Sequence, residues 1–187
     1  MDPNYEKILS FLRNLPDDGK IFDFPLTEFG YQIVPGLNRG AYIGPSPMAY
    51  LAGRRDFSGN PILEPFSATL LNLIKEKNVD DIKRLFGLLN VKYIFYNSDP
   101  RAYEEYFPQV PNTVLLKLLP DSASLSDFVN KVIGEKIVNF GTYHLYHADK
   151  DYYLPHFYVP TSVVPYDGRK IDYIGLNTSF FVDTKLT

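Results

Sequence analysis

The sequence VKYIFY at residues 91–96 is the clearest strand signal in this chain. β-Branched and aromatic residues favour strands, and a nearly continuous apolar run is typical of a strand that is covered on both faces. The turn-forming sequence Asn97-Ser98-Asp99-Pro100 follows directly and ends the run. We therefore expect residues 91–96 to form the central strand of a sheet.

Helices are expected on the N-terminal side of this strand. Apolar residues recur at helical spacing in residues 66–77 and again in 79–89, with Asn78 between the two patterns. At the start of the chain, Asp2 and Pro3 suit the cap and first position of another helix. Further strands are predicted at 20–24, 136–140, 142–147, 154–159, 172–176 and 179–182, and further helices at 47–53, 101–107 and 124–134, while 113–119 fits either type. This alternation predicts an α/β fold, with a mixed sheet of about five strands and helices packed on it.

A single layered domain is expected over residues 1–160. The chain has 187 residues, of which 45% are hydrophobic and 22% charged, and a chain of this size and composition can bury its own core. Residues 25–65 are rich in Pro and Gly, so we expect them to be largely irregular. Residues 161–187 change to short strand-like pieces, and we interpret them as a C-terminal extension or as added edge strands.

Composition excludes several classes of function. The net charge is −3, and no block of Lys or Arg offers the basic surface that nucleic acid requires. The absence of cysteine excludes disulfides, thiolate metal sites and cysteine nucleophiles. No run reaches the roughly 18 apolar residues that span a bilayer, and the polar N-terminus is unlike a signal peptide, so we expect a soluble chain.

The histidines do not predict a metal site. His144 and His147 lie three apart in an expected strand, where side chains alternate between the two faces. Two ligands on opposite faces cannot bind one ion, and His156 falls in a different predicted strand. We expect structural or surface roles for all three, and we predict no metal and no cofactor.

No catalytic residue is predicted, because the chain lacks a phosphate-binding loop, a dinucleotide fingerprint and a nucleophile elbow. Asp23 and Glu28, near the end of the first expected strand, are the only carboxylates that merit a catalytic hypothesis. The other adjacent acid pairs suit a turn, the first turn of a helix and a solvated helix face; they are Asp17/Asp18, Asp80/Asp81 and Glu104/Glu105.

Candidate ligand-binding residues come from the Pro- and Gly-rich segment, because irregular segments often carry binding sites. They are Asn38, Arg39, Tyr42, Arg54 and Arg55. The chain also contains 15 Tyr and 14 Phe but no Trp, which favours an aromatic core over a carbohydrate-binding surface.

Two stretches of the sequence resemble a known family. The first runs from Lys20-Ile21-Phe22-Asp23-Phe24-Pro25-Leu26 to Leu89-Asn90-Val91-Lys92-Tyr93-Ile94, and the second runs from Gly141 to Pro160 and includes Leu154-Pro155-His156-Phe157-Tyr158-Val159. Together they resemble the soluble extracytoplasmic region of multi-pass membrane proteins of the YfhO-like and related glycosyltransferase C superfamily. The resemblance covers roughly two thirds of the chain, and its motifs are short and hydrophobic. His156 stands where the family more often has Arg.

The resemblance implies a non-catalytic accessory domain at the extracytoplasmic face of the membrane. Its expected partners are the transmembrane portion of the parent protein and a glycan or lipid-linked sugar. The family's catalytic acids lie on loops close to the membrane helices, so none is transferred to this chain. Two alternatives stay open: a free-standing glycan- or peptide-binding module, and a small hydrolase with an acid pair that includes Asp23 or Glu28.

Overall fold

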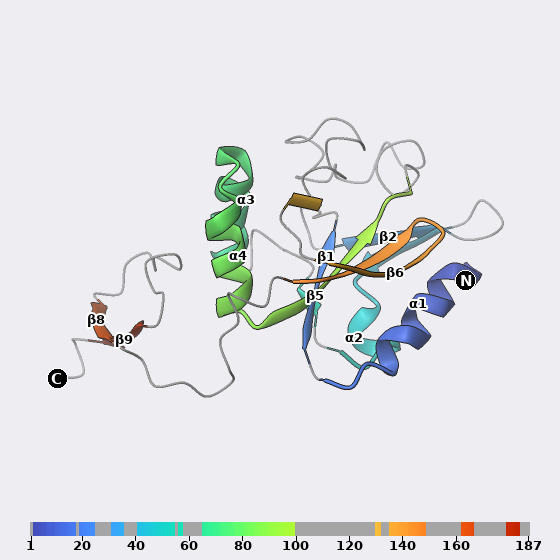
Figure 1. Cartoon of the computed structure of the whole chain (residues 1–187), viewed down its shortest axis with the longest axis horizontal. Helices are drawn as coiled ribbons and strands as arrows, with labels where there is room; N and C mark the ends of the chain where they lie inside the picture. Colours follow the sequence, from blue (N-terminus) through green and yellow to red (C-terminus); the bar gives the residue numbers. More distant parts are fainter. Residues whose placement is uncertain are drawn as a thin grey trace.

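The computed structural model describes residues 2–17, 19–24, 31–35, 41–54, 56–57, 65–99, 130–131, 135–148, 162–166 and 179–183. Its helices are α1 (Pro3–Arg13), α2 (Met48–Leu51), α3 (Pro65–Glu76) and α4 (Val79–Leu88) (Figure 1). Its strands are β1 (Lys20–Phe24), β2 (Tyr31–Pro35), β3 (Ala41–Pro45), β4 (Asp56–Phe57), β5 (Val91–Asn97), β6 (Lys136–Phe140), β7 (Tyr143–His147), β8 (Ser162–Tyr166) and β9 (Ser179–Asp183). No helix within these ranges is both long and apolar enough to cross a membrane.

The main sheet has the strand order β4-β1-β5-β7-β6 and is mixed. Strand β1 runs parallel to β4 and β5, whereas β7 runs antiparallel to β5 and β6. The predicted α/β class and the central position of β5 are confirmed. The prediction of about five strands is corrected to four full-length strands, because β4 adds only two residues at the edge.

Helix α1 covers one face of this sheet, as its apolar spacing predicts. Asp2 caps the helix by accepting a hydrogen bond from the Asn4 N–H at 2.8 Å, and Pro3 occupies the first turn. Its buried residues join β-strand residues and the α2 residue Met48 in one core cluster: Tyr5, Ile8, Leu9, Leu12, Ile21, Tyr93, Phe95, Tyr143 and Leu145.

Helix α4 lies against the opposite face, and α3 packs on α4. Phe22 of β1 contacts Phe86 of α4 with a ring-centroid distance of 5.0 Å. Asn78 caps α4 by accepting from the Asp81 N–H, and Asp80 and Asp81 occupy the first turn, as the sequence predicts. Since Ile21 and Phe22 point to opposite faces, β1 is buried on both sides.

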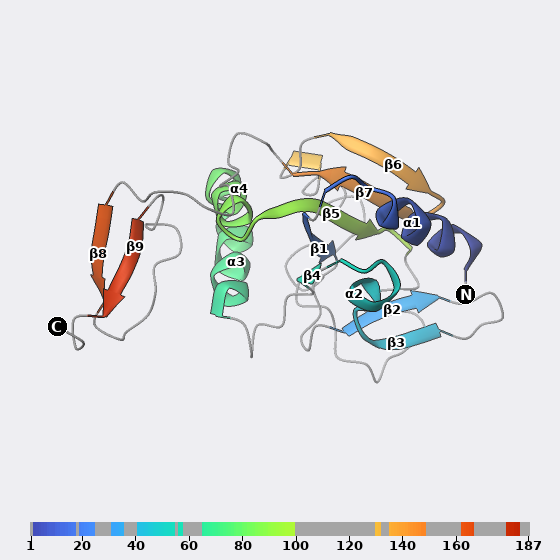
Figure 2. The ribbon, with the colours of Figure 1, turned by 90° about the horizontal axis from the view of Figure 1, so that it is seen from below.

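The largely irregular structure expected for residues 25–65 is wrong for the parts that can be described. Strands β2 and β3 form an antiparallel hairpin, and its buried residue Val34 belongs to the same cluster as Met48 (Figure 2). Pro35 and Pro45 stand at strand ends, where a missing N–H does not interrupt the ladder. The short helix expected at 47–53 is confirmed as α2.

Several expectations fall partly or wholly outside the described ranges. Strands β8 and β9 pair with each other in parallel, and β9 matches the strand expected at 179–182. The boundary at residue 160 stays a prediction. The elements expected at 101–107, 113–119, 154–159 and 172–176 are outside, and only residues 130–131 of the helix expected at 124–134 are described, as helix.

Candidate functional site

A pair of aspartates meets on the α1 face of the sheet. In the parallel pairing of β1 with β4, Asp56 lies opposite Ile21. Asp23 lies two residues farther along β1, and residues two apart in a strand share a face, so Asp23 and Asp56 are diagonal neighbours. Asp23 is fully buried. One of the two carboxylates suggested by the sequence has therefore found an acidic partner, whereas Glu28 is outside the described residues.

Ser46 donates a hydroxyl hydrogen bond to Asp23. Its Oγ donates to Asp23 Oδ2 at 2.6 Å and accepts from the Met48 N–H at the start of α2. In the described part of the chain, the remaining oxygens Asp23 Oδ1 and Asp56 Oδ2 are buried and find no N–H or O–H donor. Buried acceptors without donors are costly, so this arrangement calls for a proton between the two carboxyls.

The electrostatics of the pair agree with a shared proton. Burial raises the pKa of Asp23 well above its ordinary value, and Asp56 raises it further through its charge and through a hydrogen bond between the carboxyls. The hydrogen bond from Ser46 opposes this rise but is outweighed. Two close carboxyls in apolar surroundings titrate as one unit, and a first proton binds far more tightly than a second.

Tyr5 lies beside the carboxyl pair and packs among other aromatic side chains. The Tyr5 ring meets the edges of Tyr143 at 5.2 Å and Phe95 at 6.2 Å between centroids. The Tyr5 hydroxyl is buried and has no hydrogen-bond partner among the residues that the structure describes. Its pKa is raised, first by burial and then by the charges of Asp23, Tyr143, Asp56 and Tyr42, which places all four around it. Tyr42 is 46% exposed and marks the side of this site nearest to solvent.

This arrangement suits the storage of a proton better than metal chemistry. Across the described ranges, no group of three or more His, Cys, Asp or Glu side chains is placed to hold a metal ion. His144 and His147 lie on opposite faces of β7, as expected, because their rings contact Tyr96 and Tyr93 respectively. His156 is outside the described residues.

His144 is engaged within the fold on the α4 face. Its Nε2 lies 2.8 Å from Ser98 Oγ, and that hydroxyl also donates to the carbonyl of Thr142 at 3.0 Å. The serine proton therefore has an acceptor in the backbone, and His144 is best placed to donate to Ser98 rather than to activate it. Burial, followed by the charge of Lys136, lowers the pKa of His144.

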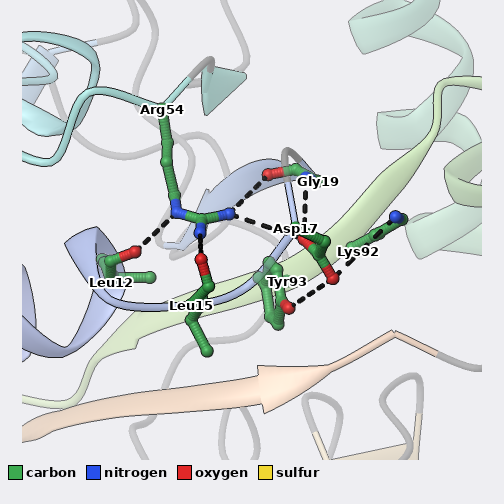
Figure 3. Close-up of polar contacts among 7 residues, drawn as sticks. All are labelled: Leu12, Leu15, Asp17, Gly19, Arg54, Lys92 and Tyr93. Atoms are coloured by element: carbon green, nitrogen blue, oxygen red, sulfur yellow. Dashed lines mark hydrogen bonds and ion pairs between the residues drawn. The ribbon is translucent and has the colours of Figure 1, made fainter.

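Arg54 is buried and ties the end of α1 to the chain that precedes β4 (Figure 3). Its Nε donates to the carbonyl of Leu12 at 2.6 Å, its Nη2 to that of Leu15 at 2.8 Å, and its Nη1 to that of Gly19 at 3.5 Å. Free carbonyls at a helix C-terminus need such donors. The sequence suggested a ligand-binding role for Arg54, but its guanidinium is occupied inside the fold.

Asp17 completes this network beside Arg54. Asp17 Oδ1 accepts from the Gly19 N–H at 2.9 Å and lies 3.6 Å from Arg54 Nη1, while Oδ2 accepts from the Tyr93 hydroxyl at 2.8 Å (Figure 3). Burial acts to raise the pKa of Asp17, but the hydrogen bonds from Gly19 and Tyr93 and the charges of Lys92 and Arg54 together lower it. The turn predicted at Asp17 therefore also contains ion pairs with Arg54 and Lys92.

The other predicted ligand-binding residues are only partly placed. Tyr42 lies on β3 and is exposed, while Asn38, Arg39 and Arg55 are outside the described residues. Sequence reasoning missed Asp56, Ser46 and the Tyr5 hydroxyl. The available signals were weak: Tyr5 fits an apolar helix face, and Asp56 follows two arginines in a Pro- and Gly-rich segment.

Fold and site together define a mixed α/β domain with a carboxyl pair on the α1 face of its sheet, in which Asp23 is fully buried. No protein-family model matches this chain, and neither a curated protein nor a solved structure matches it.

Proposed function

We propose that the chain is a non-catalytic extracytoplasmic accessory domain of a membrane glycosyltransferase-like protein that acts on lipid-linked sugars. The proposal rests on the sequence resemblance described above. One structural observation supports it: the two ends of the first resembling stretch, at residues 20–24 and 91–94, lie in the adjacent parallel strands β1 and β5. The helices α3 and α4 precede residues 91–94, in the order that the resemblance implies.

The use of polar groups in the fold supports a scaffolding role. The guanidinium of Arg54 and the carboxylate of Asp17 stabilise a helix end and a turn, and Asp23 has no exposed surface. Groups that act on a substrate must reach it, whereas these groups face the protein interior. The partners we propose are the transmembrane portion of the same protein and the sugar-bearing head of its lipid-linked substrate.

Deletion in the full-length protein tests this proposal. Membranes carrying the complete parent protein are compared with membranes in which residues 1–187 are replaced by a flexible linker, and sugars released from lipid by mild acid are quantified. We expect the deletion to lower sugar transfer, and we expect the isolated chain to transfer none. Transfer by the isolated chain, or a parent reading frame without membrane helices, would refute the proposal.

A glycan- or peptide-binding module is the second candidate, and Tyr42 is the observation that favours it. Its ring is exposed and lies near Tyr5, and exposed aromatic rings suit the binding of sugars. NMR titration with soluble glycans and peptides would give saturable shifts at Tyr42, Asn38, Arg39 and Arg55. The Arg54 Nε signal should stay unchanged, because that group is bonded inside the fold. Absence of saturable shifts removes this candidate.

One observation supports the hydrolase alternative: Asp23 and Asp56 lie close together. Another opposes it, because Asp23 is fully buried. Chromogenic glycosides and esters test it directly. Hydrolysis that disappears in both Asp23→Asn and Asp56→Asn would establish this alternative, and activity that survives both changes would exclude the pair as its source.

A further inference from the structure

We propose that Asp23 and Asp56 form a proton-operated latch that holds strand β4 on the edge of the main sheet. This inference goes beyond the accessory role proposed above and does not rest on it.

Strand β4 is the weakest attached element of the sheet. It has two residues and pairs with β1 at two positions, Ile21 with Asp56 and Phe22 with Phe57. Strand β1, by comparison, pairs with β5 along all five of its residues. If the two carboxyls repel each other, β4 is therefore the strand that gives way, and Asp23 stays fixed within β1.

The polar side chains placed beside the pair are uncharged. Tyr5 of α1 lies close enough that the charges of both carboxyls raise its pKa, and Ser46 donates to Asp23 from the segment before α2. From β5 the apolar Phe95 lies beside Asp23. In the described part of the chain, no cation is among the influences on the pKa of Asp23. Loss of the shared proton would leave two like charges in surroundings that stabilise neither of them.

The chain before β4 is fixed independently of the latch. Arg54, two residues before Asp56, is anchored to the carbonyls of Leu12 and Leu15. Release of β4 would therefore begin after Arg54 and would leave α1 in place. The movement would uncover Asp23 and the Tyr5 hydroxyl, both of which are buried while β4 is docked. The latch is closed when the pair holds its proton and opens as pH rises.

Hydrogen exchange of the whole chain, followed by NMR as a function of pH, tests the latch. We expect the protection factors of the β4 amides to fall as pH rises, by up to about tenfold per pH unit, which is the limit for one linked proton. The amides of β5 should keep their protection. In Asp56→Asn the side-chain amide donates to Asp23 at every pH, so the fall should disappear. Glu76→Gln, a change at an exposed site on α3, should retain it.

A second measurement does not depend on any variant folding well. In wild-type protein with ¹³C-labelled aspartate carboxyls, the Asp23 signal should titrate above the ordinary range of aspartate. Titration of Asp23 within the ordinary range would overturn the proposal. Equal pH dependence of protection in β4 and β5, or an unchanged fall in Asp56→Asn, would overturn it as well.

Discussion

The Nε of Arg54 donates a hydrogen bond to the carbonyl oxygen of Leu12 over 2.6 Å, between residues 42 positions apart in the sequence. A side chain from much later in the sequence therefore supplies a hydrogen-bond donor to the last turn of α1. The same guanidinium satisfies Leu15 and approaches Asp17, so one buried residue joins a helix end, a turn and the approach to β4.

Arg54→Ala should lower the free energy of unfolding by roughly 3 kcal/mol, because it leaves buried carbonyls without donors. Arg54→Lys should recover little, since an ammonium group cannot reproduce the planar fork of donors. Urea denaturation measures both changes. Arg84 is the matched control, because its side chain is 57% exposed and forms an ion pair with Asp81 on the same helix. Arg84→Ala should stay within about 0.5 kcal/mol of wild type. Equal effects at the two arginines would contradict the role assigned to Arg54.

Two tyrosine-to-phenylalanine changes should differ in their effect on stability. Tyr93→Phe removes the hydroxyl that donates to Asp17 and should cost about 1.5 kcal/mol. Tyr5→Phe removes a buried hydroxyl that has no partner within the described ranges, so the free energy of unfolding should be unchanged or higher. Denaturation of both variants in the same buffer makes the comparison. A larger loss for Tyr5→Phe than for Tyr93→Phe would mean that the Tyr5 hydroxyl is satisfied in solution.

Asp17 should contribute to acid sensitivity. Its pKa is lowered in the folded state, so its stabilising effect is present above the pKa of the unfolded chain and is lost as pH falls through the folded value. Asp17→Asn should therefore be less stable than wild type near neutrality, and the difference should shrink in acid. Thermal denaturation between pH 7 and strongly acidic buffer measures this. Glu135→Gln, at an exposed site, is the control and should leave the pH profile as in wild type.

The carboxyl pair should act on global stability in the opposite direction. The pKa of Asp23 is raised in the folded state, so its contribution is complete below the pKa of the unfolded chain and is lost as pH rises through the folded value. Asp56→Asn should flatten this decline on the alkaline side while leaving the acid limb due to Asp17 in place. An unchanged alkaline decline in Asp56→Asn would show that other groups cause it.

Two glycines test a close approach between the β6–β7 turn and α1. Gly53 and Gly141 both have positive φ, +66° and +60°, so alanine at either position should cost roughly 1 kcal/mol. A Cβ on Gly141 would also lie 2.7 Å from the Asn4 side chain, whereas one on Gly53 would meet nothing within 4 Å. Gly141→Ala should therefore be the more destabilising change. Adding Asn4→Ala should remove the excess, and additive effects in this double-mutant cycle would rule out the contact.

Local sequence signals were sufficient to predict the helices and strands whose ends are marked by capping or turn-forming residues. Asp2 and Pro3 begin α1, Asn78 begins α4, and the apolar run at 91–96 is the central strand, all as predicted. The hairpin β2–β3 was not predicted, because proline and glycine at strand ends resemble the punctuation of an irregular segment.

Of the carboxyl pair in the candidate site, only Asp23 could be predicted from the sequence. Asp23 stood out because it lies near the end of a recognisable strand, but its partner comes from a two-residue strand whose position depends on tertiary pairing. Arg54 was proposed as a ligand-binding residue because it lies in the Pro- and Gly-rich segment, and irregular segments often carry binding sites. Its burial follows from free carbonyls at the end of α1, which no local pattern around residue 54 reveals.

The central position of β5 has a consequence for synthesis of the chain on the ribosome. One edge of this strand pairs with β1, which has already emerged, but the other edge waits for β7, which is translated about fifty residues later. During that interval an apolar strand edge lacks its partner, and such an edge can recruit strands from other nascent chains. The nascent chain must therefore protect this edge until β7 is synthesised, and the completed sheet shows no sign of that requirement.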